Sequence, residues 1–190
     1  HIPKNIFERT IRRFIPSINK NVKGSDNYRR LNDVLREESR AQRRILVLGG
    51  SMLGEGIEVL MNNPSLDVLD SDVSLGPRTV LICDAHDIPF EDGSFDGVIA
   101  QAVLEHVVDP YRCVEEIHSV LNDRGVVYAE TPFIQQAHGV PYDFTRFTHL
   151  GHRRLFRKFD EIDSGATCGP GMALAWSYQY FLLSFTTSRT

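Results

Sequence analysis

From residue 44 onward, short apolar runs alternate with segments whose apolar residues recur at helical spacing. This alternation is typical of a parallel β-sheet whose strands are joined by helices covering both faces. It predicts an α/β fold, a three-layer sandwich with a mostly parallel central sheet. We expect strands at residues 45–48, 66–73, 79–83, 95–103 and 125–131, and a weaker one at 159–164.

The connection after the fourth expected strand has clear helix signals. Asp109 can cap a helix with Pro110 in its first turn, and Gly125 is expected to stop it. A further helix is expected at residues 173–185. In the helix that Asp109 caps, the apolar residues expected to be buried are Val114, Ile117 and Leu121.

Charge divides the chain into two parts. Residues 1–44 hold 12 Lys and Arg against 5 Asp and Glu, a net charge of +7, which leaves −11 for the remainder of a chain whose total is −4. We expect an N-terminal basic helical cap at residues 1–43, with a second helix around 27–42, and one larger domain at 44–190.

The basic arm predicts a short amphipathic helix. Its apolar residues recur at positions i, i+3, i+4 and i+7, and Pro16 would end or kink it. Such a helix could touch an anionic membrane surface, RNA or an acidic substrate, or it could pack its apolar stripe on the core. The stripe consists of Ile11, Phe14, Ile15 and Ile18.

A glycine-rich turn, in the sequence ILVLGGSMLGEG, follows the first expected strand and should open a helix. Glycine lets the backbone approach a ligand closely, and the free N–H groups of a helix start favour an anionic group. Gly49, Ser51 and Gly54 have nearly the spacing of a dinucleotide-binding turn, and Asp70 and Asp72 lie where such a fold places its ribose-binding acid. A nicotinamide dinucleotide site and a turn without ligand both stay open here.

Residues 83–110, CDAHDIPFEDGSFDGVIAQAVLEHVVDP, are the most specific stretch. An Asp-Ala pair just past a strand, then Pro-Phe, Ser-Phe-Asp, an apolar strand and Leu-Glu-His resembles the class I S-adenosylmethionine (SAM)-dependent methyltransferases of the small-molecule type, the methyltransferase domain 11-like family. The resemblance covers roughly residues 44–135. It implies a Rossmann-like sandwich, SAM as cofactor and a methyltransferase domain at 44–190, with the family's C-terminal antiparallel hairpin looking incomplete.

The resemblance also implies roles for individual residues. Asp72 matches the acid of the Asp-x-Ser pattern that closes the second strand and would accept the ribose hydroxyls. Asp84 would contact the adenine amine, with Ala85 and His86 lining that side. Gln101 would lie near the methionine and sulfonium end. The amino-acid tail would be surrounded by the turn residues Gly49, Gly50, Ser51 and Gly54.

Two positions depart from the family pattern. Val47 stands where the family usually carries an acid that helps to hold the methionine ammonium, and Ser51 replaces a glycine. A hydrogen bond to a charged group is worth about 1.5–3 kcal/mol, so we expect cofactor affinity to fall by ~10- to 100-fold. A catalytically silent SAM- or nucleotide-binding module is therefore an alternative.

The loop after the fifth expected strand carries the acceptor-side candidates. Its His-x-x-Pro-Tyr-Asp-Phe-x-Arg-Phe sequence resembles a subset of bacterial methyltransferases in which this loop covers the active site. By this resemblance His138 is the candidate catalytic base, and Tyr142, Asp143 and Arg146 are candidate substrate residues. The alternative for the last two is a structural ion pair.

Histidine and cysteine spacing predicts no metal site. None of the 7 histidines has a convincing partner along the chain, and His106 is expected to fix a helix entrance by a hydrogen bond. The 3 cysteines lie far apart without a CxxC pair, which fits a reducing cytoplasm. The apolar stretch at residues 172–185 is short for a membrane crossing and nothing reads as a signal peptide, so we expect a cytoplasmic location.

The sequence therefore predicts a SAM-dependent methyltransferase acting on a small-molecule acceptor, which the basic arm would suit if that acceptor is anionic or linked to a lipid or sugar. Peripheral membrane contact through the arm stays open. An RNA-directed methyltransferase is a further alternative. It is disfavoured because no Asn-Pro-Pro-Tyr-type segment follows the fourth strand and the arm lacks interleaved aromatic and basic residues.

Overall fold

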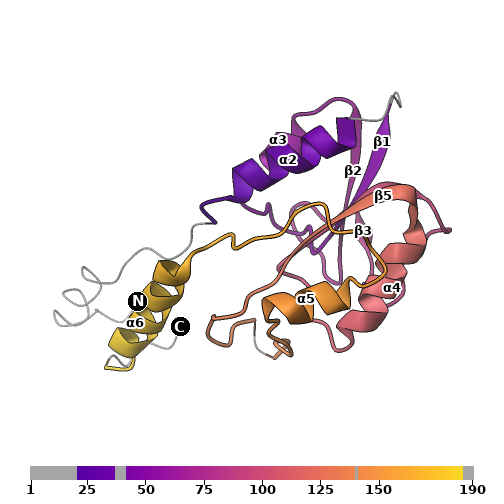
Figure 1. Cartoon of the computed structure of the whole chain (residues 1–190). Coiled ribbons are helices and arrows are strands. Elements are labelled where there is room, and N and C mark those ends of the chain that lie inside the picture. Colours follow the sequence, from indigo (N-terminus) through magenta and orange to yellow (C-terminus); the bar gives the residue numbers. More distant parts are fainter. Residues whose placement is uncertain (1–20, 37–41, 140, 186–190) are drawn as a thin grey trace.

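Five parallel strands form the central sheet of this computed structural model, which describes residues 21–36, 42–139 and 141–185 (Figure 1). The strand order is β3-β2-β1-β4-β5, and every neighbouring pair is parallel. The fold is the Rossmann-like α/β sandwich that the sequence predicts. The strands are β1 (Arg43–Leu48), β2 (Leu66–Asp72), β3 (Leu81–Ile82), β4 (Phe95–Gln101) and β5 (Leu121–Glu130).

Helices cover both faces of the sheet (Figure 1). One face packs against α2 and α3, and the other against α4 and α5. Because successive strand residues point to opposite faces, the alternate residues of β1 enter different cores: Ile45 and Val47 face the first pair, and Leu46 and Leu48 face the second. The helices are α2 (Gly24–Arg36), α3 (Glu58–Met61), α4 (Pro110–Val120), α5 (His149–Leu155) and α6 (Pro170–Leu183).

The start of α4 is confirmed and its predicted end is wrong. The Asp109 carboxylate accepts hydrogen bonds from the backbone N–H groups of Tyr111 and Arg112, with Pro110 in the first turn. The helix ends at Val120 because Leu121 adopts extended backbone and begins β5. Gly125 therefore lies within β5 and does not stop the helix.

The weak strand expected at residues 159–164 is absent from the described structure, which has turns and irregular backbone there. Ser164 donates a hydrogen bond to the nearby Glu161 carboxylate (2.7 Å), and such local polar contacts compete with strand pairing. The glycine-rich turn also does not open a helix directly, since α3 begins only at Glu58.

Helix α6 stands away from the sheet in Figure 1, and none of its residues is buried. Its apolar side chains include the exposed Leu174, Tyr178 and Phe181. Among the described residues, no helix combines the length and apolarity that a bilayer crossing requires. The predicted basic arm helix at residues 4–17 lies outside the described part of the chain.

Candidate functional site

The order of the strands reverses between β1 and β4. The chain moves outward from β1 to β2 and β3, and then crosses back so that β4 and β5 lie on the other side of β1. In open α/β sheets, ligands bind in the crevice at the carboxyl ends of the strands at such a switch point. A binding crevice is therefore expected beside Leu48 and Gln101, where β1 and β4 end.

A cleft of about 370 Å³ lies at this switch point. Three of the predicted cofactor residues line it, namely Gly49, Gly54 and Gln101. The predicted Gly50, Ser51, Asp72, Asp84, Ala85 and His86 are outside its lining, at the turn after β1 and the ends of β2 and β3. Besides Gln101, the polar residues that line the cleft are Asn21, Tyr28, Glu55, Asp70, Arg78 and Glu130.

Asp72, the last residue of β2, is connected to the glycine-rich turn. Its carboxylate accepts hydrogen bonds from the Ser51 backbone N–H (3.3 Å) and from the backbone N–H and hydroxyl of Ser74 (3.0 and 3.1 Å). Burial opposes ionisation of Asp72, but these donors prevail and lower its pKa. Ser51 lowers the Asp72 pKa through both its side chain and its backbone N–H, and the turn forms with serine in place of the family's glycine.

Asp70, the other acid that the sequence places where a dinucleotide fold has its ribose-binding acid, lies within β2 and is shielded from solvent. Its side chain is buried and forms an ion pair with Arg78 (2.5 Å). Burial raises the pKa of Asp70, while Arg78 opposes the rise. The pair forms a polar wall of the cleft, and the Asp70 carboxylate is already occupied by the guanidinium.

Asp84, just past β3, has a mostly exposed side chain. Its Oδ1 accepts from the backbone N–H and the ring Nδ1 of His86 (2.9 and 2.7 Å), and these donors lower the Asp84 pKa. The His86 Nε2 accepts from the Asp109 backbone N–H (3.0 Å), which ties this turn to the start of α4. Among the described residues Asp84 Oδ2 has no donor, so it is open to a ligand.

Gln101 lies at the centre of a polar network. Its Oε1 accepts from the Tyr28 hydroxyl (3.0 Å), and its Nε2 donates to Glu130 (3.0 Å). Burial and the Glu130 charge raise the Tyr28 pKa, so the phenol stays protonated. The adjacent Ala102 has φ 54°, a conformation rare outside glycine, and its N–H donates to the Glu130 carbonyl (3.0 Å). The network thus joins α2, β4 and β5.

The loop after β5 contains the ion pair between Asp143 and Arg146, which the sequence analysis gave as the alternative to substrate binding by these residues. Asp143 and Arg146 make two hydrogen bonds (2.5 and 2.8 Å), and the Asp143 carboxylate also accepts from the His138 backbone N–H (2.8 Å). Hydrogen bonds from Arg146 hold the Asp143 pKa well below its usual range. Asp143 and Arg146 line a second hollow of about 260 Å³. The Tyr142 side chain is exposed and does not line it.

Glu105 and His106, in the turn after β4, lie next to this loop. The Glu105 carbonyl accepts from the N–H groups of Phe144 and Thr145 (2.8 and 3.2 Å), and His106 Nδ1 bonds to the Tyr142 carbonyl. The sequence prediction that His106 fixes a helix entrance is therefore wrong: it ties two loops together, and Asp109 caps the helix.

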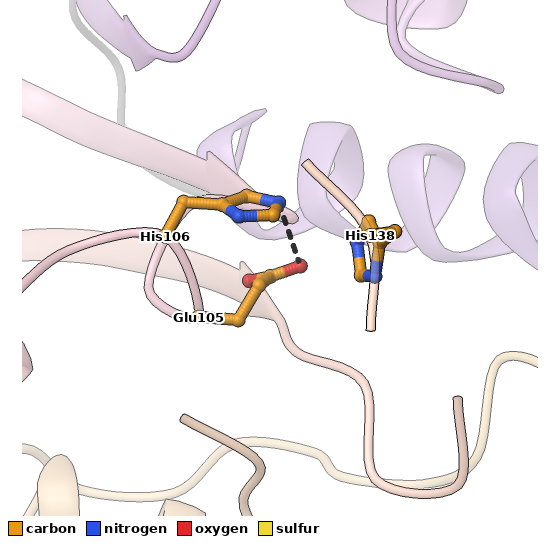
Figure 2. A group of neighbouring side chains, drawn as sticks. All are labelled: Glu105, His106 and His138. Atoms are coloured by element: carbon orange, nitrogen blue, oxygen red, sulfur yellow. Dashed lines mark ion pairs between the residues drawn. The ribbon is translucent and has the colours of Figure 1, made fainter. Parts of the chain in front are cut away.

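Figure 2 shows the Glu105 carboxylate facing the space between the imidazoles of His106 and His138. The Glu105 side chain is 0% exposed, and neither carboxylate oxygen has a hydrogen-bond partner among the described residues. Burial raises the Glu105 pKa to about 7, while the Glu105 backbone N–H and then the charges of His106 and Arg146 oppose the rise. The two histidine rings lie edge to face, with centroids 4.9 Å apart.

Sequence reasoning missed Glu105 and Glu130. A signal existed for each, since Glu105 is an acid within the apolar run AVLEHVV and Glu130 is an acid directly after the apolar run VVYA. No signal along the sequence could bring His138 to Glu105, because their contact depends on how the loop after β5 folds back.

Comparison with known proteins supports the reading of the fold. Residues 51–129 match the family described as "Methyltransferase domain". No curated protein matches the chain significantly in sequence. The solved structures described below are 17–20% identical to this chain and bear on the fold alone.

Three of these structures illustrate the likeness. A methyltransferase in complex with the Haloferax volcanii Trm112 methyltransferase activator has a TM-score of 0.52 at 20% identity, over 82% of this chain and 76% of that one. The YcgJ protein of Bacillus subtilis has a TM-score of 0.52 at 17% identity, over 70% and 67%. Haemonchus contortus phosphoethanolamine N-methyltransferase 2, solved with phosphomonomethylethanolamine and S-adenosylhomocysteine, has a TM-score of 0.51 at 17% identity, over 70% of this chain and 36% of that one.

Proposed function

We propose that this chain, in which residues 51–129 match a methyltransferase domain, is a class I SAM-dependent methyltransferase and transfers a methyl group from SAM to a small-molecule acceptor. The observation that carries the proposal is the cleft at the β1/β4 switch point, with Gly49 and Gln101 in its lining. Its volume of about 370 Å³ suits a cofactor-sized ligand.

The polar groups at the strand ends suit SAM. Asp72, ionised and held by the glycine-rich turn, would accept the ribose hydroxyls. Asp84, ionised and with Oδ2 open, would accept the adenine amine, with Ala85 and His86 beside it. Bound SAM would supply an electrophilic methyl group on its sulfonium. These residues would hold and orient that group, and in-line positioning provides most of the rate.

Val47 leaves the methionine end without the family's usual acid, and we propose that Glu130 takes over its role. Val47 is buried. Both Val47 and Glu130, the last residue of β5, line the cleft. Glu130 accepts hydrogen bonds from Asn21 (2.9 Å) and Gln101 (3.0 Å), which fix its carboxylate at the cleft. An ammonium group there would gain a charge-assisted hydrogen bond.

A nicotinamide dinucleotide is less well supported as the ligand. A dinucleotide fold places its pyrophosphate at the N-terminus of a helix that follows the glycine-rich turn. Here the turn leads into irregular backbone, and α3 begins at Glu58 with only 4 residues.

The acceptor would lie beside the loop after β5. His138 is our candidate for the base that a hydroxyl acceptor requires, and Arg146 and Tyr142 are candidates for acceptor contacts. Asp143 largely balances the Arg146 charge. The proposal that the acceptor is anionic therefore rests on the basic residues of the N-terminal arm and not on Arg146. Deleting residues 1–18 should reduce turnover most at low salt, where screening is weakest.

Titration calorimetry tests the proposal. We expect SAM and S-adenosylhomocysteine (SAH) to bind, NADH not to bind, and Asp84→Ala to weaken both SAM and SAH. Tight NADH binding that survives Asp84→Ala would reject the SAM site. His138→Ala and Arg146→Ala should keep SAM affinity within about threefold while lowering methyl transfer. A large loss of SAM binding in either would mean that these residues serve the cofactor.

A further inference from the structure

Three potential metal ligands meet where the turn after β4 touches the loop after β5. The ligand atoms of Glu105, His106 and His138 all lie within 4.8 Å of one another (Figure 2). Glu105 Oε1 is 3.9 Å from His106 Nε2, which is too long for a hydrogen bond. Donor atoms of a tetrahedral zinc site are ~3.4 Å apart, given bonds of about 2.0–2.1 Å. Small side-chain rotations would therefore close the set around an ion.

The hydrogen bonds of both histidines leave one nitrogen of each ring free to coordinate. His106 Nδ1 bonds to the Tyr142 carbonyl, which can only accept, so Nε2 keeps its lone pair. His138 Nδ1 lies 3.2 Å from the Gln136 carbonyl. Arg146 Nη2 is also 3.3 Å from His138 Nδ1, but its two hydrogens go to Gln136 and Asp143. His138 is thereby assigned Nδ1–H, which leaves the Nε2 lone pair free. Metal-binding histidines are commonly held in this way.

Glu105 gives independent evidence for a cation. Its carboxylate is fully buried, and neither oxygen has a hydrogen-bond partner among the described residues. Buried carboxylates are ordinarily paired, hydrogen-bonded or bound to metal. The guanidinium of Arg146, whose charge acts on Glu105, is instead taken up by Asp143.

Gly139 leaves space beside the cluster. It has φ +67°, and a Cβ built there would meet His106 Cε1 at 2.7 Å and lie 3.5 Å from His106 Nε2. The same Cβ would lie 3.1 Å from His106 Nδ1, so any larger residue would crowd the His106 imidazole, chiefly at Cε1 and Nδ1.

We propose that Glu105, His106 and His138 bind one divalent transition-metal ion of the zinc type. Two imidazoles and one carboxylate are a zinc ligand set that leaves a position open, whereas Mg²⁺ prefers oxygen ligands. If the proposed methyl transfer is correct, the open position would take the acceptor's hydroxyl oxygen and make it easier to deprotonate. His138 would then be a metal ligand and not the general base.

The test uses the full chain, stripped with EDTA and titrated with the metals alone. We expect calorimetry to give one Zn²⁺ per chain, and Co²⁺ to give a visible absorption spectrum that Zn²⁺ abolishes. Since losing a residue that only supports a ligand costs about 10- to 100-fold in affinity, His138→Ala and Glu105→Gln should each weaken Zn²⁺ by at least ~100-fold. The matched control His118→Ala, which removes an imidazole of α4 outside the cluster, should leave Zn²⁺ affinity unchanged.

Two results would overturn the metal site. One is a wild-type chain that binds Zn²⁺ no more tightly than His138→Ala does, and the other is equal Zn²⁺ affinity in Glu105→Gln and wild type. His138 is a loop residue whose replacement leaves the buried core intact, so the test holds even if Glu105→Gln fails to fold. SAH titration of the same samples separates the two proposals: SAH binding without Zn²⁺ binding rejects only the metal, and Zn²⁺ binding without SAH binding rejects only the SAM site.

Discussion

The backbone N–H of Ser51 donates a hydrogen bond to the Asp72 carboxylate (3.3 Å), joining the turn after β1 to the end of β2. Together with hydrogen bonds from the Ser51 side chain and from Ser74, this contact lowers the pKa of Asp72 at the edge of the sheet where the strand ends meet. A substitution at Asp72 therefore affects both a proposed ribose contact and the glycine-rich turn.

Asp72→Asn should weaken SAH by about 1.5–3 kcal/mol, because a charged acceptor is lost. Calorimetry with 5′-methylthioadenosine, which keeps the ribose but lacks the amino-acid part, should show a similar loss. Asp67→Ala, an exposed acid of the same strand, is the control and should bind both compounds as the wild type does. Unchanged SAH affinity in Asp72→Asn would remove Asp72 from the site.

Glu130→Gln should weaken SAH by ~10- to 100-fold, because it removes the charge proposed to meet the methionine ammonium. Binding of 5′-methylthioadenosine should stay the same, since that compound has no ammonium group. If both compounds lose affinity equally, Glu130 supports the shape of the cleft and does not contact the ammonium.

Gly54→Ala should disturb the Gln101 network. A Cβ at Gly54 would meet Gln101 Oε1 at 2.0 Å, so the amide must leave its contacts with Tyr28 and Glu130. We expect a loss of about 1 kcal/mol in the free energy of unfolding and weaker SAH binding. Gly165→Ala, where nothing lies within 4 Å of the added Cβ, should change neither quantity. Equal SAH affinity in both variants would contradict the placement of Gly54 at the cofactor cleft.

Asp109→Ala should destabilise the protein by about 1 kcal/mol, because the N-terminus of α4 loses its side-chain cap. Urea unfolding followed by circular dichroism measures the change. The exposed Asp123 caps no described helix, so Asp123→Ala is the matched control. Equal midpoints for the two variants would show that the cap contributes little.

The cysteines should differ in reactivity. Burial raises the pKa of Cys83 to about 11 and that of Cys113 to about 12, whereas Cys168 is half-buried. A thiol of pKa 11 is only roughly 1% thiolate at pH 9, and the thiolate is the reactive form. Ellman's reagent should therefore modify one thiol quickly in the native protein up to pH 9, and all three after denaturation. In Cys168→Ser the fast phase should vanish, and its persistence would place a buried thiol at the surface.

Sequence patterning was sufficient to predict the sheet. β1 and β4 are buried on both faces, so their near-continuous apolar runs identify them without ambiguity. The carboxyl ends of adjacent parallel strands meet at the same edge of a sheet. Gly49 and Gly54, which follow β1, and Gln101, which ends β4, therefore lie at one cleft. Boundaries were harder to predict, because Leu121 carries an apolar side chain that suits both α4 and β5.

The acceptor side could not be predicted in the same way. The proximity of Glu105 and His138 depends on the hydrogen bonds that hold residues 142–145 against the turn after β4. The pairing of Asp70 with Arg78 likewise depends on the path of an irregular loop. Such contacts form between segments without periodicity, so sequence spacing carries no signal for them.

Strand β1 pairs with β2 on one side and with the much later β4 on the other, so that Ile45 lies opposite both Val68 and Gly97. During synthesis, a nascent chain that ends before β4 would leave β1 as an edge strand, with one row of backbone groups unpaired and its apolar side chains exposed. Pairing β1 with β4 closes a long loop, which lowers the conformational entropy of the chain before the contacts between the two strands can stabilise it. We therefore expect the core to form only after residues 95–101 leave the ribosome, and shorter fragments to aggregate or bind chaperones.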